Sequence, residues 1–206
     1  QATSVVTSDM RVDKLVRNIR SPKYSLADQR EQLDLLAELN RMHMDRSEHD
    51  AQLDGQIRAM ETAFRMQAAV PDVLDVAREP EHVRRLYGLD SDDEHERLYA
   101  LQALRARRLV EAGVRFVEIT CPSFDGNNSP WDQHGMLRVN HEKNARVTEQ
   151  SVAALIIDLK RRGLLDQTIV LWAGEMGRTP HTPAISATCG RDHHVNGFTL
   201  FLAGGG

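Results

Sequence analysis

Apolar residues in the first 112 positions recur every three or four residues, the spacing of helices that bury one face. The first clear helix is predicted to begin at Ser25, where Asp28 stands in the capping-box position. Its apolar stripe consists of Leu26, Leu33, Leu36, Leu39 and Met42. The polar stretch 45–50 is expected to break or bend this helix. A second helix is predicted to run to about Ala69, with Pro71 ending it.

The next segments are also predicted to be helical. Residues 71–89 indicate a short helix or turns, closed at Tyr87-Gly88. The acidic run 90–96 is expected to supply an N-cap and favourable first-turn charge to a strong helix over residues 95–112, which Gly113 ends. Clustered carboxylates can bind calcium, but this run lacks the glycine and spacing of an EF-hand loop.

After Gly113 the helical period gives way to short apolar runs typical of strands. Residues 114–120 (Val-Arg-Phe-Val-Glu-Ile-Thr) predict one strand and residues 168–173 a second, with a long helix over 141–162 between them. Strand, helix and strand make a βαβ unit, with parallel strands and a right-handed crossover. We therefore expect an α/β fold in which residues 1–112 are mainly helical and residues 113–206 form an α/β portion.

Polar side chains with catalytic potential follow the two predicted strands. Asp132 and His134 come after the first strand, and Glu175 and Arg178 after the second. Because the carboxyl ends of parallel strands share one sheet edge, these side chains are expected to meet there. A third strand is predicted over residues 197–203; if it is antiparallel, as we expect, residues 191–194 reach the same edge.

The converging set has the chemistry of a metal site beside an anion site. Carboxylates and imidazoles suit divalent zinc, manganese or iron. The candidate ligands are Asp132, His134, Glu175, Asp192, His193 and His194. The guanidinium groups of Arg178 and Arg191 match phosphate or sulfate oxygens. Together they predict metal-assisted hydrolysis or transfer of a phosphate or sulfate ester.

Each part of this set also has a structural interpretation. Asp132 can cap a turn while His134 packs beside Trp131, and Glu175 with Arg178 can be an ion pair at a strand end. Arg191 and Asp192 can form a local salt bridge, and usually only one of two adjacent histidines reaches a site. The sequence has no P-loop, no dinucleotide-binding glycine pattern and no nucleophile elbow; Ser123, Ser129 and Thr179 are nucleophiles by position only.

Composition narrows the class of protein. The chain is 41% hydrophobic and 27% charged with a net charge of −4, an ordinary globular composition that argues against a general nucleic-acid binder. The basic runs 105–108 and 160–162 are expected to be solvated helix faces. Two cysteines make no disulfide framework, and no apolar run approaches the roughly 20 residues of a membrane span.

Several blocks in order give the chain a family likeness. They are 63–67 (Ala-Phe-Arg-Met-Gln), 113–117, 131–134 (Trp-Asp-Gln-His), 158–166, 174–180 (Gly-Glu-Met-Gly-Arg-Thr-Pro), 190–194 (Gly-Arg-Asp-His-His) and 202–206. From about Leu33 to the end, the chain resembles the family named domain of unknown function 1501. That family is similar to sulfatases and alkaline phosphatases, which implies an alkaline-phosphatase-like α/β/α sandwich, here partial, with a mainly helical N-terminal portion.

The resemblance also implies roles for individual residues. Glu175 stands where that superfamily has a metal-binding aspartate, and Met176 where it has a second ligand. Asp132 and His134 resemble an acid and histidine ligand pair, and His193 or His194 the late histidine ligand. The nucleophile of the superfamily comes from an earlier part of the chain. Since this chain starts at Gln1 and stops after a predicted strand, we expect one domain truncated at both ends, with the nucleophile upstream.

The sequence thus predicts a metal-dependent hydrolase of sulfate or phosphate esters. Its cofactor is expected to be zinc, manganese or calcium, and its partner a small anionic ester or a sulfated or phosphorylated polymer, with no nucleic acid and no membrane span. Family resemblance suggests export to the periplasm. The alternative is a non-catalytic module of the same fold that binds an anion or polysaccharide or serves a structural role. The sequence leaves the substrate, the metal and the oligomeric state open.

Overall fold

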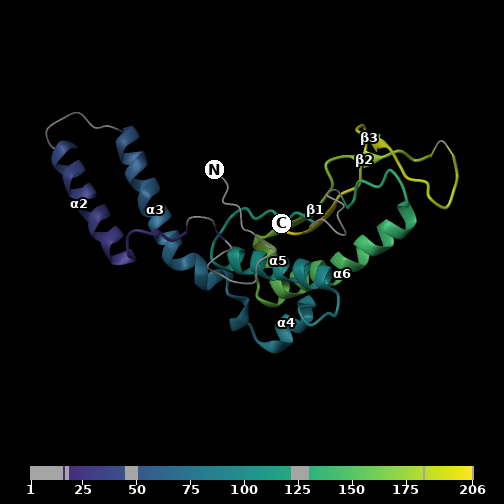
Figure 1. Cartoon of the computed structure of the whole chain (residues 1–206), viewed down its shortest axis with the longest axis horizontal. Helices are drawn as coiled ribbons and strands as arrows, with labels where there is room; N and C mark the ends of the chain where they lie inside the picture. The colour runs from purple at the N-terminus through teal and green to yellow at the C-terminus, as the bar shows by residue number, and fades with distance from the viewer. Residues whose placement is uncertain (1–15, 17–18, 45–50, 122–129, 183, 206) are drawn as a thin grey trace. The chain divides into compact units, whose positions relative to one another are not determined.

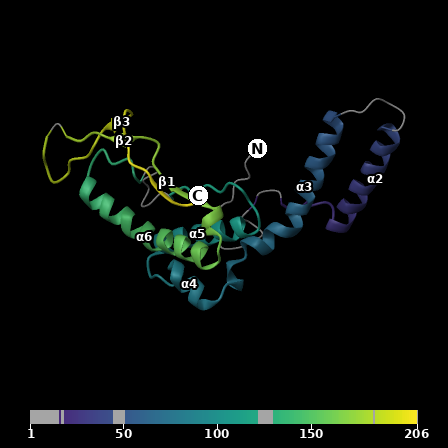
Figure 2. The same ribbon diagram turned by 180° about the vertical axis from the view of Figure 1, so that it is seen from behind.

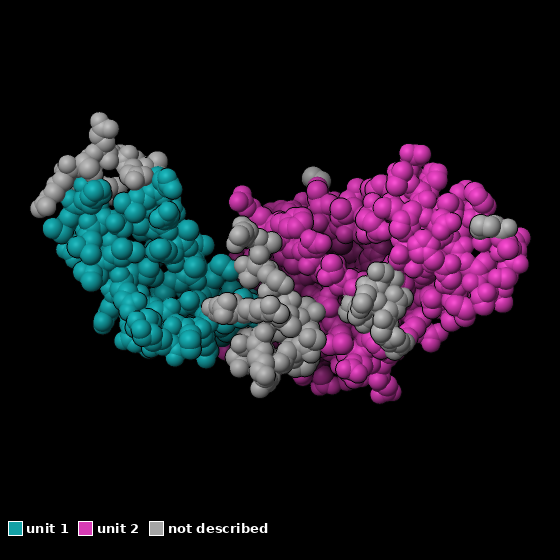
Figure 3. Space-filling model, turned by 45° about the horizontal axis from the view of Figure 1, so that its top comes forward, with its two compact units in different colours: residues 1–75 teal, residues 76–206 magenta. Residues whose placement is uncertain are grey.

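The computed structural model describes residues 16, 19–44, 51–121, 130–182 and 184–205. The chain divides into two compact units, residues 1–75 and residues 76–206 (Figure 3). The fold is mixed α/β and mostly helical, with two small antiparallel sheets. Among the described helices, none has the length and apolar character that crossing a membrane requires.

The first unit contains helices α2 (Leu26–Met44) and α3 (Ala51–Leu74). The predicted capping box is confirmed: the Asp28 N–H donates to Ser25 Oγ at 3.1 Å, and the Ser25 N–H donates to the Asp28 carboxylate at 2.9 Å. These two bonds satisfy main-chain donors that the first turn of a helix leaves free. The predicted break at 45–50 lies outside the described residues.

Helix α3 continues through Pro71, so the prediction that this proline ends the helix was wrong. Proline removes its own N–H and crowds the preceding turn. Here Pro71 removes one main-chain bond, the one that an N–H at position 71 would donate to the carbonyl of residue 67, and three residues of helix follow it. Leu74, at the end of α3, is completely buried, and that burial favours keeping the helix to its last residue.

The second unit begins with the 3-10 turn η1 (Val76–Arg78), followed by α4 (Glu81–Tyr87) and α5 (Glu94–Glu111). The predicted caps are confirmed. Gly88 closes α4 in the left-handed conformation (φ 93°), which glycine adopts without a Cβ penalty. Asp93 caps α5 by accepting a bond from the His95 N–H at 2.7 Å.

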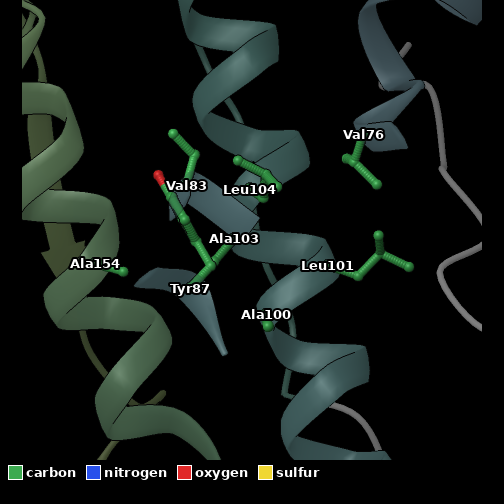
Figure 4. Close-up of a cluster of buried hydrophobic side chains, with 8 residues drawn as sticks. All are labelled: Val76, Val83, Tyr87, Ala100, Leu101, Ala103, Leu104 and Ala154. Atoms are coloured by element: carbon green, nitrogen blue, oxygen red, sulfur yellow. The ribbon is translucent and has the colours of Figure 1, made fainter. Parts of the chain in front are cut away.

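Helix α6 (Leu137–Arg161) starts four residues before the predicted His141 and is followed by the 3-10 turn η2 (Leu165–Gln167). Helices α4, α5 and α6 pack around one apolar cluster (Figure 4). Its members are Val76, Val83, Tyr87, Ala100, Leu101, Ala103, Leu104 and Ala154. The sequence grouped α5 with the N-terminal helices, but it packs with α6 in the second unit.

Charged groups are buried beside this apolar cluster. The Arg107 side chain is only 1% exposed, and its guanidinium lies 2.7 Å from the Glu79 carboxylate and 3.0 Å from that of Asp158. Arg108 also pairs with Glu79. The Tyr87 hydroxyl donates to Asp158 at 3.1 Å. The buried charges of Arg107, Glu79 and Asp158 therefore have partners of opposite sign, which burial of an ion requires.

The prediction that run 105–108 is a solvated face was therefore wrong. Arg105 is 3% exposed and Arg107 is 1% exposed. Charge alone did not reveal this burial, because the carboxylates that pair with Arg107 come from Glu79, the residue after η1, and from Asp158 in α6. The second basic run, 160–162 at the end of α6, is exposed as predicted.

Two ladders make up the sheets. β1 (Ile169–Trp172) pairs antiparallel with β4 (Phe201–Gly204), which places Trp172 opposite Phe201. This confirms the second predicted strand and the reversed direction of the last one. β2 (Gly177–Arg178) pairs antiparallel with β3 (His193–His194), a ladder that the sequence did not predict. Figures 1 and 2 both show β2 and β3 near the N-terminal end of α6.

The predicted strand over residues 114–120 is absent, although these residues are described. Its pattern was that of a strand, but a strand needs a neighbour, and β1 pairs with β4 instead. Phe116 is accordingly 81% exposed. The expected parallel βαβ unit was therefore wrong for the described part of the chain.

Candidate metal centre

The loop that carries Asp132 and His134 is anchored on α6. Gln133, between them, is 4% exposed, and its side-chain amide donates to the Pro130 carbonyl at 3.3 Å. The other end of the Gln133 side chain contacts Nδ1 of His141 on α6 at 3.3 Å. Burial of Gln133 turns the residues on either side of it outward, toward the ladder formed by β2 and β3.

Trp131 secures the start of the same loop. Its ring meets those of His141 and Trp172 edge to face, with centroids 5.3 Å and 6.1 Å apart. Aromatic pairs favour this arrangement because the positive ring edge faces the negative ring face. Trp131 therefore has a packing role. The alternative that His134 only packs beside Trp131 is not what the structure shows, because His134 contacts Asp192 and His193.

The second loop is joined to the first by main-chain bonds. The Arg191 N–H donates to the Gln133 carbonyl at 3.0 Å, and Gly135 forms an isolated bridge with Cys189. Gly190 lies so close to His134 that an added Cβ would be 2.0 Å from the His134 carbonyl carbon. Only glycine fits this contact, which brings the two loops into register.

Three ligand atoms converge where the loops meet. The Nε2 atom of His193 lies 2.9 Å from Oδ1 of Asp132, and the Nε2 atom of His134 lies 3.1 Å from the same oxygen. The two Nε2 atoms are 3.2 Å apart. Among the described residues, these three form the one group whose geometry could hold a metal ion.

Positive charge surrounds the Asp132 carboxylate. The hydrogen bond with His193 is the main reason that the pKa of Asp132 lies below its ordinary value, and the Arg178 guanidinium, 2.7 Å away, adds to the effect. Arg178 also reaches the Glu175 carboxylate at 3.1 Å. Arg178 and His193 are opposite each other in the β2–β3 ladder, so both can approach Asp132 from the same face.

The other predicted site residues lie around this group rather than within it. Asp192 contacts His134 at Nδ1, 3.1 Å away, on the other edge of the ring from Asp132. Arg191 donates to the Thr179 carbonyl at 2.8 Å. His194 follows His193 in β3, and successive strand residues point to opposite faces. The convergence of loops was thus predicted correctly, but the β2–β3 ladder and the Gly135–Cys189 bridge produce it, not a parallel crossover.

Sequence reasoning missed the residues that hold the loops together. Gln133 and Gly190 were passed over, although a glycine directly before Arg-Asp-His was a visible signal of close main-chain approach. Thr179 was noted only as a nucleophile by position. Its hydroxyl instead accepts from the Asp192 N–H at 3.1 Å and donates to the His181 carbonyl at 2.8 Å. Ser123 and Ser129 lie outside the described residues.

The donor set fits a divalent ion. For bonds of about 2.0–2.2 Å, neighbouring ligand atoms on one ion lie about 2.8–3.1 Å apart at right angles and about 3.3–3.6 Å apart at tetrahedral angles. The three distances within the group, 2.9, 3.1 and 3.2 Å, lie close to the right-angle range and below the tetrahedral one. Two imidazoles and a carboxylate suit zinc, manganese and iron. His134 is 47% and His193 45% exposed in their side chains, so a small ligand can reach the group from solvent.

Comparison with known proteins places the chain in a family. Residues 1–206 match the model of the family described as "Protein of unknown function (DUF1501)", and the chain belongs to it. No curated protein and no solved structure matches the chain.

Proposed function

We propose that this protein is a divalent-metal-dependent hydrolase of phosphate or sulfate esters, with Asp132, His134 and His193 as the metal ligands. The observation that carries the proposal is the approach of three ligand atoms to within 3.2 Å of one another at the junction of two loops. At such distances the lone pairs of the carboxylate oxygen and of the two imidazole nitrogens repel one another unless a proton or a cation lies between them. A shared cation satisfies all three at once.

The charges around the group favour an anionic substrate. The carboxylates of Asp132, Glu175 and Asp192 and the guanidiniums of Arg178 and Arg191 carry a formal net charge of −1. A divalent ion reverses this charge to +1, which attracts an anion. When bound, such an ion supplies charge neutralisation and an acidified water molecule for ester hydrolysis.

The protein's own groups prepare the site for this chemistry. Arg178 holds the Asp132 carboxylate from one side, and Gln133 fixes the main chain of the loop. Blocks 174–180 and 190–194 resemble those of the DUF1501 family, and the resemblance of that family to sulfatases and alkaline phosphatases suggests this reaction class. Kinship with that superfamily and its α/β/α sandwich is part of the same proposal.

Metal analysis of the purified chain tests the proposal. Zinc and manganese content and affinity are compared between the wild type, a D132A/H134A double variant and a D166A/H82A control. The control changes the same residue types at two exposed positions outside the group. We expect stoichiometric metal in the wild type and control and loss of it in D132A/H134A. Equal metal content in all three proteins would contradict the ligand assignment.

One observation favours the non-catalytic alternative. Arg178 and Arg191 both donate to protein groups, to two carboxylates and to a main-chain carbonyl. If these bonds persist when an anion arrives, the protein binds metal without turnover. A panel of aryl phosphates and aryl sulfates, assayed with the metal-loaded full-length protein and its D132A/H134A variant, separates the two functions. Hydrolysis that depends on Asp132 and His134 supports the enzyme, and metal binding without hydrolysis supports the binding module.

A further inference from the structure

The two nitrogens of His134 face different partners. Nε2 faces Asp132 Oδ1 and His193 Nε2, the atoms of the metal group, at 3.1 Å and 3.2 Å. Nδ1 faces Asp192 Oδ1 at 3.1 Å. The ring nitrogens lie on different edges of the imidazole, so Asp192 contacts the edge that is turned away from the metal group.

The hydrogen bonds of His134 favour one position for the proton of its neutral ring. The Nδ1–Asp192 contact is a hydrogen bond, and since an ionised carboxylate only accepts, that bond needs a proton on Nδ1. The contact of Nε2 with Asp132 is a close approach without the geometry of a hydrogen bond, whereas Nε2 is hydrogen-bonded to Nε2 of His193. Nε2 then has a free lone pair directed at Asp132 and His193. A histidine ligand needs such a lone pair, and a carboxylate on its other nitrogen commonly sets the tautomer and the ring orientation.

We propose that Asp192 is a positioning residue rather than a metal ligand: it holds His134 in the tautomer and orientation that present Nε2 to Asp132 and His193. This inference rests on the proposed metal site. It divides the two aspartates into distinct roles, with Asp132 as ligand and Asp192 as the partner of a ligand.

The main chain holds Asp192 in place for this role. The Thr179 N–H donates to the Asp192 carbonyl at 2.8 Å, and the Asp192 N–H donates to Thr179 Oγ1 at 3.1 Å. These bonds continue the β2–β3 ladder by one residue. The Asp192 side chain itself is 69% exposed, so its bond to His134 orients the ring without contributing much to the stability of the fold.

Zinc affinity of the full chain, measured by competition with a chromophoric chelator, provides the first test. D192A is expected to bind zinc roughly 10–100-fold more weakly than the wild type. D192N is expected to lose much less, because the amide oxygen still accepts from Nδ1–H. D166N, a change of the same charge at an exposed position, should match the wild type.

The tautomer itself is measured by long-range ¹H–¹⁵N NMR of the histidine rings in metal-free protein. The His134 signals, assigned with H134Q, should show the Nδ1–H form in the wild type and D192N and a mixture in D192A. An unchanged tautomer with unchanged zinc affinity in D192A would overturn the inference. Equal losses of affinity in D192N, D192A and D132A would also overturn it, by making Asp192 a ligand.

These measurements keep the two proposals apart. If the wild type binds neither zinc nor manganese, the proposed function fails, whereas the NMR result still tests the link between Asp192 and His134. If the wild type binds zinc and D192A binds it equally well, only the positioning role fails.

Discussion

Gly190 lies directly against the main chain of His134. An added Cβ at Gly190 would be 2.0 Å from the His134 carbonyl carbon and 2.1 Å from its oxygen. Both atoms belong to the main chain, so no side-chain rotation could relieve the overlap. The loop that carries His134 and the loop that carries His193 can therefore lie this close only because residue 190 has no side chain.

Gly190→Ala should separate these loops and weaken zinc binding at least tenfold, because Asp132 and His134 lie on one loop and His193 on the other. The far-UV circular dichroism spectrum should change little, since the apolar cluster of α4, α5 and α6 is elsewhere. Zinc affinity and circular dichroism, measured on the same samples, check both parts. Wild-type affinity in the variant would contradict the described loop contact.

Gly55→Ala is the matched control for that substitution. Gly55 lies within α3, and a Cβ there would meet nothing within 4 Å. Alanine favours a helix over glycine, so this variant should be more stable by about 0.5–1 kcal/mol. Denaturant unfolding measures the gain, and a loss of stability would show that the position is not an open helix surface.

Zinc should stabilise the wild type by mass action. A ligand that binds only the folded state at 100 times its dissociation constant adds about 2.7 kcal/mol to the free energy of unfolding. Thermal unfolding with zinc, and again after excess chelator, should show a reversible rise in Tm. D132A/H134A should show no such rise; an equal shift in this variant would indicate binding elsewhere.

The buried carboxylate of Glu79 should make stability depend on pH. Burial by itself would raise the pKa of Glu79, but the guanidiniums of Arg107 and Arg108 hold it below its ordinary value of 4.5. A depressed pKa means that the stabilisation is present above about pH 4.5 and is lost as the pH falls through the lower, folded-state pKa. The free energy of unfolding should therefore fall as the pH is lowered from 4.5 toward 3.

Glu79→Gln isolates this contribution from other carboxylates. At pH 7 the variant should be less stable by about 3 kcal/mol, because it leaves Arg107 short of a counter-charge. Its stability should also fall less steeply below pH 4.5. Identical slopes for the two proteins in denaturant titrations would show that Glu79 does not supply the pH dependence.

Leu101 tests the apolar cluster. It is completely buried, and Leu101→Ala should lower the free energy of unfolding by about 2–5 kcal/mol through lost burial and a residual cavity. Leu35→Ala is the control: Leu35 is 59% exposed in α2, so the change should be within about 0.5 kcal/mol. Chemical denaturation compares them, and equal costs would argue against the described packing.

The sequence predicted helix ends correctly where a single residue type determines where the helix begins or ends. Ser25 with Asp28, Asp93 and Gly88 mark helix ends because capping and positive φ depend on a few neighbouring atoms. The same holds for the apolar run of β1. The last strand was predicted with the correct direction, because only an antiparallel strand would bring residues 191–194 to the same sheet edge.

Predictions that depend on distant partners were less secure. Residues 114–120 have a strand pattern but no strand neighbour, and nothing within the segment could reveal this. Arg107 is charged yet buried, because Glu79 and Asp158 approach it from other elements. The site shows both cases: Asp132, His134 and His193 were identified by type, whereas the exclusion of His194 from the group follows from its place in β3.

Trp172 pairs with Phe201, so residues 173–200 form the segment that connects β1 to β4. This segment carries Arg178, Asp192 and His193. Within it, the β2–β3 ladder fixes the ends of a further loop between Thr179 and Asp192. Evolution can therefore lengthen or shorten that inner loop without shifting β1 or β4. Changes in its length should likewise leave the approach of His193 to Asp132 in place.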